Sequence, residues 1–104
     1  MKRNLTIKTL QEHIKIVDNK PEKKYEIALK LFEEVGELSV EMRKAHEQGL
    51  TPSVKQNIKY ELYDVLHYVN VIANLYDIDL EEAILEKDQI NAKRYNDREV
   101  LNHD

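Results

Sequence analysis

The fold is decided by residues 21–47, PEKKYEIALKLFEEVGELSVEMRKAHE, in which the pattern of an amphipathic helix is unbroken. Apolar residues recur at i, i+3, i+4 and i+7, the spacing of a helix that buries one face. Pro21 stands at the first helical position, where its missing N–H costs nothing, and Gly49 follows the last turn. The side chains expected to face the core are Ala28, Leu31, Val35, Leu38, Met42 and Ala45.

Helical patterns also cover the chain on either side of this segment. We expect further helices over about 5–17, 52–76 and 80–95, followed by a polar C-terminal tail. Thr51-Pro52 supplies an N-cap and first residue, and Asp79 with Glu82 has the spacing of a capping box. The helix over 52–76 would bury Ile58, Leu62, Val65, Val69, Ile72 and Tyr76. The sequence therefore predicts one all-α domain over 1–104, an antiparallel bundle of about four helices with short loops.

The composition agrees with a helical protein and excludes several functions. The 104 residues include only two glycines, two prolines and no cysteine, so disulfides and thiolate metal sites are excluded. A chain this short buries a modest core, and we expect it to be completed in a homo-oligomer, a dimer or a tetramer. The net charge of −4 argues against nucleic-acid binding. Apolar runs fall short of the ~18 residues of a membrane span and no signal peptide is evident, so we expect a cytoplasmic protein.

Two acid pairs occupy matching positions in the two long helical segments. The pairs, each with i, i+3 spacing, are Glu34 with Glu37 and Glu61 with Asp64. An apolar residue follows every acid, so antiparallel packing would bring the two pairs together at the edge of the groove between the helices. Four carboxylates at one place repel unless a cation bridges them. Because oxygen-only ligands suit Mg²⁺ or Mn²⁺, the pattern predicts a divalent-metal site.

The alternative is that these acids form the solvated face of amphipathic helices. With 20 acids in 104 residues, an acidic i, i+3 pair arises by chance. Gly36 favours the metal site, because a glycine inside a helix costs ~1 kcal/mol relative to alanine and would here leave space beside Glu34 and Glu37. Glu33 and Glu41 are nearby acids that we expect to lie behind the ligands or in solvent.

A basic stripe is expected on the last helix. Its members are Lys87, Asn91, Arg94 and Arg98, at i, i+4, i+7 and i+11. Lysine and arginine suit phosphate oxygens. Alternatively, they are cations that the helix dipole favours in the last turns, worth about 0.3–1 kcal/mol each, and this alternative holds best for Arg98. Tyr68 lies on the acid-bearing flank, where its ring could stack on a base or pack at the bundle edge. For His67, the alternatives are a polar residue at a helix interface and a residue that forms a hydrogen bond with the ligand.

These motifs together resemble a known family. Glu33-Glu34-Val35-Gly36-Glu37-Leu38 followed by Glu61-Leu62-Tyr63-Asp64 is similar to the EExxE…ExxD signature of the MazG-like all-α nucleoside triphosphate pyrophosphohydrolases. Lys87-x-x-x-Asn91-x-x-Arg94-Tyr95 resembles a segment of the small members that act on deoxynucleotides. The resemblance covers roughly residues 25–95. It implies Mg²⁺-dependent cleavage between the α and β phosphates, giving a monophosphate and pyrophosphate.

The resemblance also implies roles for individual residues. By position, the metal ligands would be Glu34, Glu37, Glu61 and Asp64. Glu37 or Glu33 would orient the attacking water as general base. Lys87 and Arg94 would stabilise charge on the leaving pyrophosphate. The substrate-binding set would be Tyr68, Lys87, Asn91, Arg94 and Tyr95. The sequence does not specify the base or the sugar.

Three other functions compete with this hypothesis. The phosphoribosyl-ATP pyrophosphohydrolases have similar acid motifs, although the segment with Lys87 and Asn91 favours nucleoside triphosphates. A ferritin-like di-iron site needs two Glu-x-x-His motifs, and only Asp64-x-x-His67 comes near one. The third is a non-catalytic helical dimerisation or adaptor module.

Overall fold

A computed structural model describes residues 4–95 and 98–101, and the described part contains four α-helices and no strand. The elements are α1 (Ile7–Val17), the 3-10 turn η1 (Pro21–Lys23), α2 (Lys24–Gln48), α3 (Pro52–Leu75) and α4 (Leu80–Arg94). The all-α prediction is confirmed. Part of the predicted polar tail, residues 96–97 and 102–104, lies outside the described residues. None of the described helices combines the length and the hydrophobicity that crossing a membrane requires.

Local side-chain chemistry sets where the helices begin and end. Thr6 caps α1, because its hydroxyl accepts from the Thr9 N–H at 3.0 Å while the Thr9 hydroxyl accepts from the Thr6 N–H at 2.8 Å. The helix consequently begins at Ile7 and not at the expected Leu5. Gly49 follows α2 with φ +91, a backbone conformation that costs other residues energy. Thr51 then caps α3 by accepting from the Val54 N–H at 3.2 Å.

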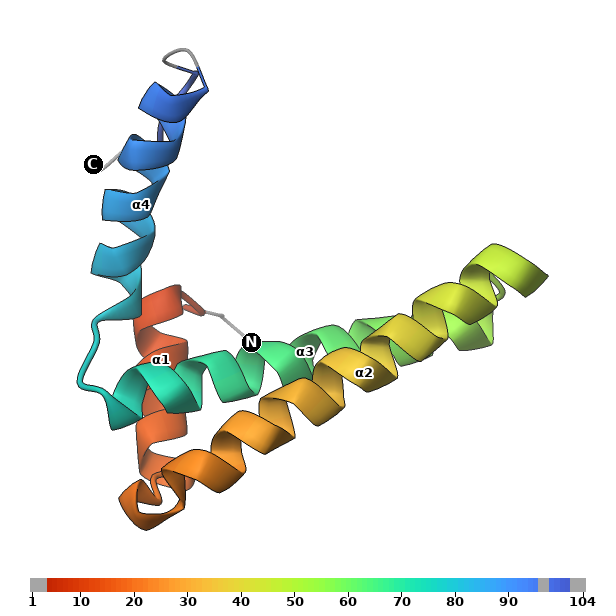
Figure 1. The fold of residues 1–104 in the computed structure, drawn as a ribbon, viewed down its shortest axis with the longest axis horizontal. Helices are drawn as coiled ribbons and strands as arrows, with labels where there is room; N and C mark the ends of the chain where they lie inside the picture. The colour runs from red at the N-terminus through yellow and green to blue at the C-terminus, as the bar shows by residue number, and fades with distance from the viewer. Residues whose placement is uncertain (1–3, 96–97, 102–104) are drawn as a thin grey trace.

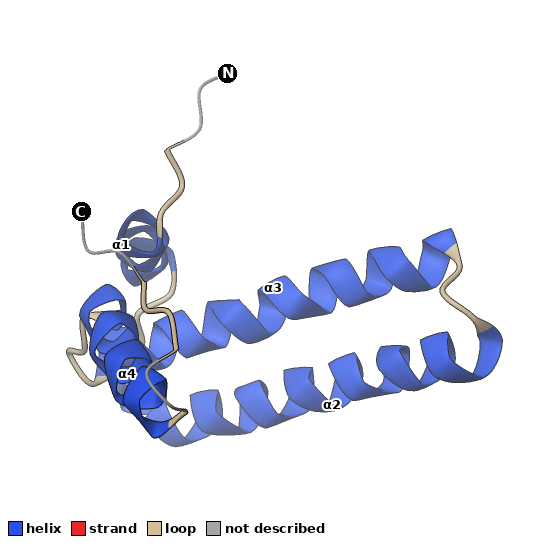
Figure 2. Ribbon diagram, turned by 90° about the horizontal axis from the view of Figure 1, so that it is seen from above, coloured by secondary structure: helices blue, strands red, loops and turns tan. Residues whose placement is uncertain are grey.

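The helices form an antiparallel pair with two helices crossing one end of it. Helices α2 and α3 lie side by side along their whole length (Figure 2), whereas α1 packs across the end of α3 farthest from the α2–α3 loop. Helix α4 packs against α1 and then runs away from the pair (Figure 1). The expected bundle is therefore open, with α4 outside the α2–α3 groove. The radius of gyration is 16.4 Å, whereas a compact chain of this length has about 13 Å.

The hydrophobic core lies where α1 crosses the pair. Ile14 and Val71 are fully buried, and Ile27 joins them from α2. Gln11 ties α1 to the far end of α3, because its side chain donates to Asn74 Oδ1 at 3.0 Å and accepts from the Leu80 N–H at 3.0 Å. These bonds fix α1 and the start of α4 relative to the pair.

The seam between α2 and α3 has a heptad repeat that includes acids. Its members, all buried or half-buried, are Ile27, Leu31, Glu34, Leu38, Glu41 and Ala45 on α2, and Val54, Ile58, Glu61, Val65, Tyr68 and Ile72 on α3. Steps of four and three alternate on both helices, as in a coiled coil. Glu34, Glu41 and Glu61 therefore stand at core positions, which the sequence reading had reserved for apolar residues.

Four side chains that we expected in the core are therefore exposed. They are Val35, Met42, Leu62 and Tyr76, with exposed fractions of 45%, 57%, 54% and 58%. The prediction was wrong because it placed all acids outside the seam. On each helix, every second residue of the expected buried stripe is therefore off by one position. The correction places the acid pairs in the seam and on one flank of it, and leaves an apolar stripe uncovered on the other flank.

Candidate metal centre in the helical seam

Three acids of the seam region come together halfway along α2 and α3. Glu34, Glu61 and Asp64 each offer a carboxylate oxygen, and these oxygens lie within 4.8 Å of one another. Glu34 and Glu61 face each other because both stand at seam positions of an antiparallel pair, and Asp64 is one turn from Glu61. The three side chains are half-buried. Oxygens at this separation match the ligand shell of one divalent cation.

The acidic cluster is electrostatically strained. Burial, and then contacts with Glu61 and Glu37 and the charge of Asp64, raise the pKa of Glu34 from 4.5 to about 7. Burial also raises the pKa of Glu61, with the charges of Glu37 and Asp64 acting in the same direction. Among the described residues, Oε2 of Glu34 and Oε2 of Glu61 are buried side-chain oxygens without a hydrogen-bond donor. Such oxygens cost stability unless a proton or a cation meets them.

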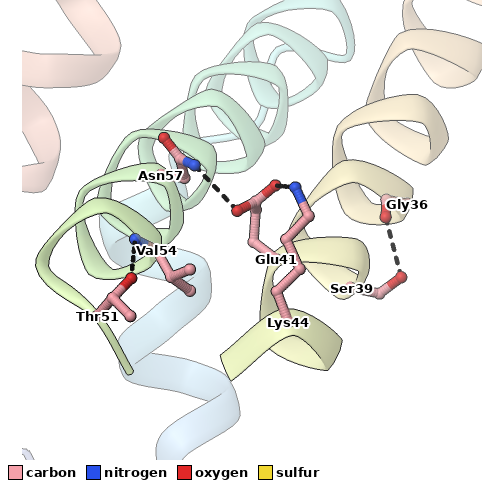
Figure 3. Close-up of polar contacts among 7 residues, drawn as sticks. All are labelled: Gly36, Ser39, Glu41, Lys44, Thr51, Val54 and Asn57. Carbon is pink, nitrogen blue, oxygen red and sulfur yellow. Dashed lines mark hydrogen bonds and ion pairs between the residues drawn. The ribbon is translucent and has the colours of Figure 1, made fainter. Parts of the chain in front are cut away.

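Glu41 shows how the same seam compensates an acid that has a structural role. It stands one heptad from Glu34, and its side chain is only 13% exposed. Asn57 Nδ2 donates to its Oε1 at 3.1 Å and Lys44 Nζ to its Oε2 at 3.1 Å (Figure 3). These two donors, Lys44 first, lower the pKa of Glu41. Glu41 is therefore neutralised within the chain, neither solvated nor behind the metal ligands as expected, whereas Glu34 and Glu61 form no ion pair with any of the described residues.

The other two acids of the sequence motif differ in position. Glu37 is exposed at the mouth of the cluster, where its carboxylate acts on both Glu34 and Glu61. Glu33 is exposed on the surface, with Lys30 Nζ 3.8 Å from its Oε2. Glu33 does not join the cluster. Gly36 has no neighbour within 4 Å of the position a Cβ would take, so the space beside it is open and the expected reason for a glycine there stays a prediction.

Tyr68 connects the cluster to the hydrophobic core. Its ring packs against the core of Ile14, Ile27 and Val71. Burial raises the pKa of its hydroxyl, which also lies within the field of Glu34 and Asp64. Tyr68 thus packs within the helical bundle and is also close enough to the carboxylates to feel their charge. Packing at the bundle edge is therefore compatible with contact to a base.

Two residues near the cluster were missed by sequence reasoning. Lys30 lies close enough to lower the pKa of Tyr68, and its place one helical turn before Glu34 was the available signal. Asp18 Oδ2 lies 2.8 Å from His67 Nε2. Their separation of 49 positions in the sequence gave no local signal.

The basic stripe of α4 lies apart from this cluster. Lys87 and Asn91 line a shallow pocket of about 410 Å³ on α4. Arg94 and Tyr95 are exposed at the end of the helix, with the guanidinium 6.0 Å from the centre of the Tyr95 ring. Helix α4, which carries this stripe, runs away from the α2–α3 pair (Figures 1 and 2). Arg98 lies beyond α4, where its Nη2 donates to Asp88 at 3.1 Å, so placing it on the helical stripe was wrong.

Comparisons with known proteins bear on the family and the fold of the chain. The model of the MazG nucleotide pyrophosphohydrolase domain family matches residues 22–97. Two crystal structures of iMazG from Vibrio DAT 722, carrying an N-terminal and a C-terminal tag, are similar to the chain at 39% identity. Their TM-scores are 0.72 and 0.71, and the matches cover 88% and 84% of this chain and 99% and 98% of theirs. No curated protein matches the chain.

Proposed function

Because the chain belongs to the MazG nucleotide pyrophosphohydrolase family, we propose that it hydrolyses a nucleoside or deoxynucleoside triphosphate between the α and β phosphates in a Mg²⁺-dependent reaction. The products would be a nucleoside monophosphate and pyrophosphate. The observation that supports this best is a difference between acids of the seam. Two side chains donate hydrogen bonds to Glu41, whereas Glu34 and Glu61 each have a buried oxygen that accepts no hydrogen bond from the described residues. A seam that needed these acids only for structure would pair them as it pairs Glu41.

The cluster suits a hard divalent cation. Glu34, Glu61 and Asp64 would hold it, with Glu37 completing the set from the mouth of the cluster. Carboxylate oxygens without nitrogen or sulfur favour Mg²⁺, with Mn²⁺ as a substitute. When bound, such a cation offsets the charge of a triphosphate and activates water for attack on phosphorus.

The protein side chains would orient the reactants. Glu37 is the better placed of the two acids considered as general base, because it reaches the cluster while Glu33 pairs with Lys30 on the surface. Tyr68 would contact the nucleoside from the core side of the cluster. Lys30, near Tyr68, would add positive charge for the phosphates.

A second copy of the chain would complete the site. The stripe of Lys87, Asn91, Arg94 and Tyr95 is suited to phosphate and sugar, yet α4 carries it away from the carboxylates of its own chain. An apolar stripe with Val35, Met42 and Leu62 lies uncovered beside the seam, as expected where two copies meet. We therefore propose a homodimer, or a tetramer of paired dimers, in which α4 of one copy serves the carboxylates of another.

The test is product analysis over a nucleotide panel that includes phosphoribosyl-ATP. With Mg²⁺ or Mn²⁺ the protein should release pyrophosphate, and Asp64→Asn should remove that activity. Glu41→Gln is the matched control, because it changes a seam acid outside the cluster and keeps an acceptor for Asn57. Orthophosphate as the only product would mean that another bond is cleaved. Equal activity in Asp64→Asn and the parent protein would exclude the proposed cluster.

A further inference from the structure

The imidazole of His67 is held between an acid from the end of α1 and the ring of Tyr68. Asp18, the residue that ends α1, places Oδ2 2.8 Å from His67 Nε2. Since a carboxylate only accepts, the Nε2–H of His67 donates this bond. The other contact is with Tyr68, whose ring centre lies 5.0 Å away with the two rings at 88°. This edge-to-face arrangement is a favoured geometry for aromatic pairs.

Both partners of the Asp18–His67 pair are anchored. Asp18 is fixed by its own N–H, which donates to the Ile14 carbonyl at 2.8 Å. Its side chain and that of His67 are each 21% exposed, so solvent competes little for the bond. Tyr63 also approaches the imidazole, with ring centres 6.2 Å apart. The orientation of the His67 ring is therefore determined by contacts on several sides.

The orientation of Tyr68 matters because of what lies beyond it. Its ring packs on the core that includes Ile14 of α1, and its hydroxyl lies within the field of Lys30, Asp18, Glu34 and Asp64. Contact with His67 restricts the ring from a further direction. A tyrosine held in this way offers a ligand a surface that is already ordered, which reduces the entropy cost of binding.

We propose that His67, held by Asp18, is a positioning residue that fixes Tyr68 as a wall of the nucleoside site beside the carboxylates. This inference rests on the proposed function, because it assigns the Asp18–His67 pair an effect on substrate binding. His67 acts through Tyr68 and does not touch the reacting phosphates. Its loss should therefore weaken nucleotide binding and leave the chemical step nearly intact.

Steady-state kinetics on Asp18→Ala, His67→Ala and the double variant test the proposal, using the nucleotide that the parent protein cleaves best. Each single change should raise KM about tenfold while kcat falls less than about threefold. The double variant should be no worse than either single one, because both remove the same contact. His67→Gln, whose amide can still donate to Asp18, should restore much of the lost binding.

Asn74→Ala is the matched control. It removes the two bonds to Gln11 that also link α3 to α1 and leaves the Gln11 bond to the Leu80 N–H at the start of α4. If the Asp18–His67 pair acted only by holding α1 in place, Asn74→Ala would raise KM equally, and that result would overturn the proposal. Additive effects of Asp18→Ala and His67→Ala, or an unchanged KM in both, would also overturn it. A parent protein that releases no pyrophosphate from any nucleotide would instead refute the proposed function, and this inference with it.

Discussion

At the scale of single residues, the surroundings of a carboxylate distinguish an acid with a structural role from an acid of the proposed metal site. Glu34 and Glu41 occupy equivalent seam positions one heptad apart. Their surroundings differ in two ways. Within α2, Lys44 stands three residues after Glu41, whereas Glu37 stands three residues after Glu34. Across the seam, Asn57 donates to Glu41, while Glu34 meets Glu61. The sequence spacing contains the first difference, and only the packing of α3 on α2 reveals the second.

Glu34→Gln should change how stability depends on pH in the metal-free protein. The pKa of Glu34 is raised from 4.5 to about 7, so the folded chain retains a proton that the unfolded chain has lost. The parent protein should therefore lose stability relative to the variant as pH rises from about 4.5 to about 7. Melting temperatures across this range measure the difference. Above it, Mg²⁺ should raise the melting temperature of the parent protein more than that of the variant, and an equal effect would contradict a cation at Glu34.

Asn57→Ala should destabilise the fold without touching the proposed site. The change removes one of the two donors to the Glu41 carboxylate and leaves Lys44 as the other, so the fold should lose a measurable part of its stability. Urea unfolding measures the loss. The double variant Glu41→Leu with Asn57→Leu should recover most of it, because the carboxylate and the amide are removed together and the Lys44 side chain, 45% exposed, can be hydrated instead. A double variant less stable than Asn57→Ala would contradict this account of the pair.

At the scale of helices, the sequence predicted the elements well and the orientation of their faces less well. Thr51 and Asp79 act as the caps that their residue types suggested, since capping depends on neighbours in sequence. The buried faces depend instead on the partner helix. Val35 and Leu62 fit an apolar stripe as well as the seam residues do, and only the packing of α2 on α3 decides between the two stripes. The contact between Asp18 and His67 likewise joins residues that only the path of α1 brings together.

Gly36→Ala should stabilise α2. An added Cβ would meet no atom within 4 Å, and alanine in place of a helical glycine gains about 0.5–1 kcal/mol. Thermal unfolding of the isolated protein measures the gain. If stability rises while pyrophosphate release falls, then substrate or a second copy occupies the space beside Gly36. A loss of stability would show that the open surroundings of this residue are not those in solution.

At the scale of the whole molecule, the described residues form an open arrangement of helices with much apolar surface exposed. The helices spread to a radius of gyration of 16.4 Å, and large apolar side chains of both long helices remain exposed. Length and composition led us to expect a shared core, because a chain of 104 residues has little interior of its own. The direction of α4 was not predictable, since it depends on how Gln11 holds the start of that helix.

Mixing two inactive variants tests whether α4 serves a second copy. Asp64→Asn should lose activity through the carboxylate cluster, and Lys87→Ala combined with Arg94→Ala should lose it through the stripe of α4. In a mixed dimer, one site would combine the intact cluster of one chain with the intact stripe of the other. Co-refolding equal amounts should therefore restore about one quarter of parental activity, because half of the dimers are mixed and each has one working site. If α4 served the cluster of its own chain, every site would carry one defect and the mixture would stay inactive. Sedimentation of the mixture confirms that dimers have formed, so an inactive mixture of dimers would refute a site shared between copies.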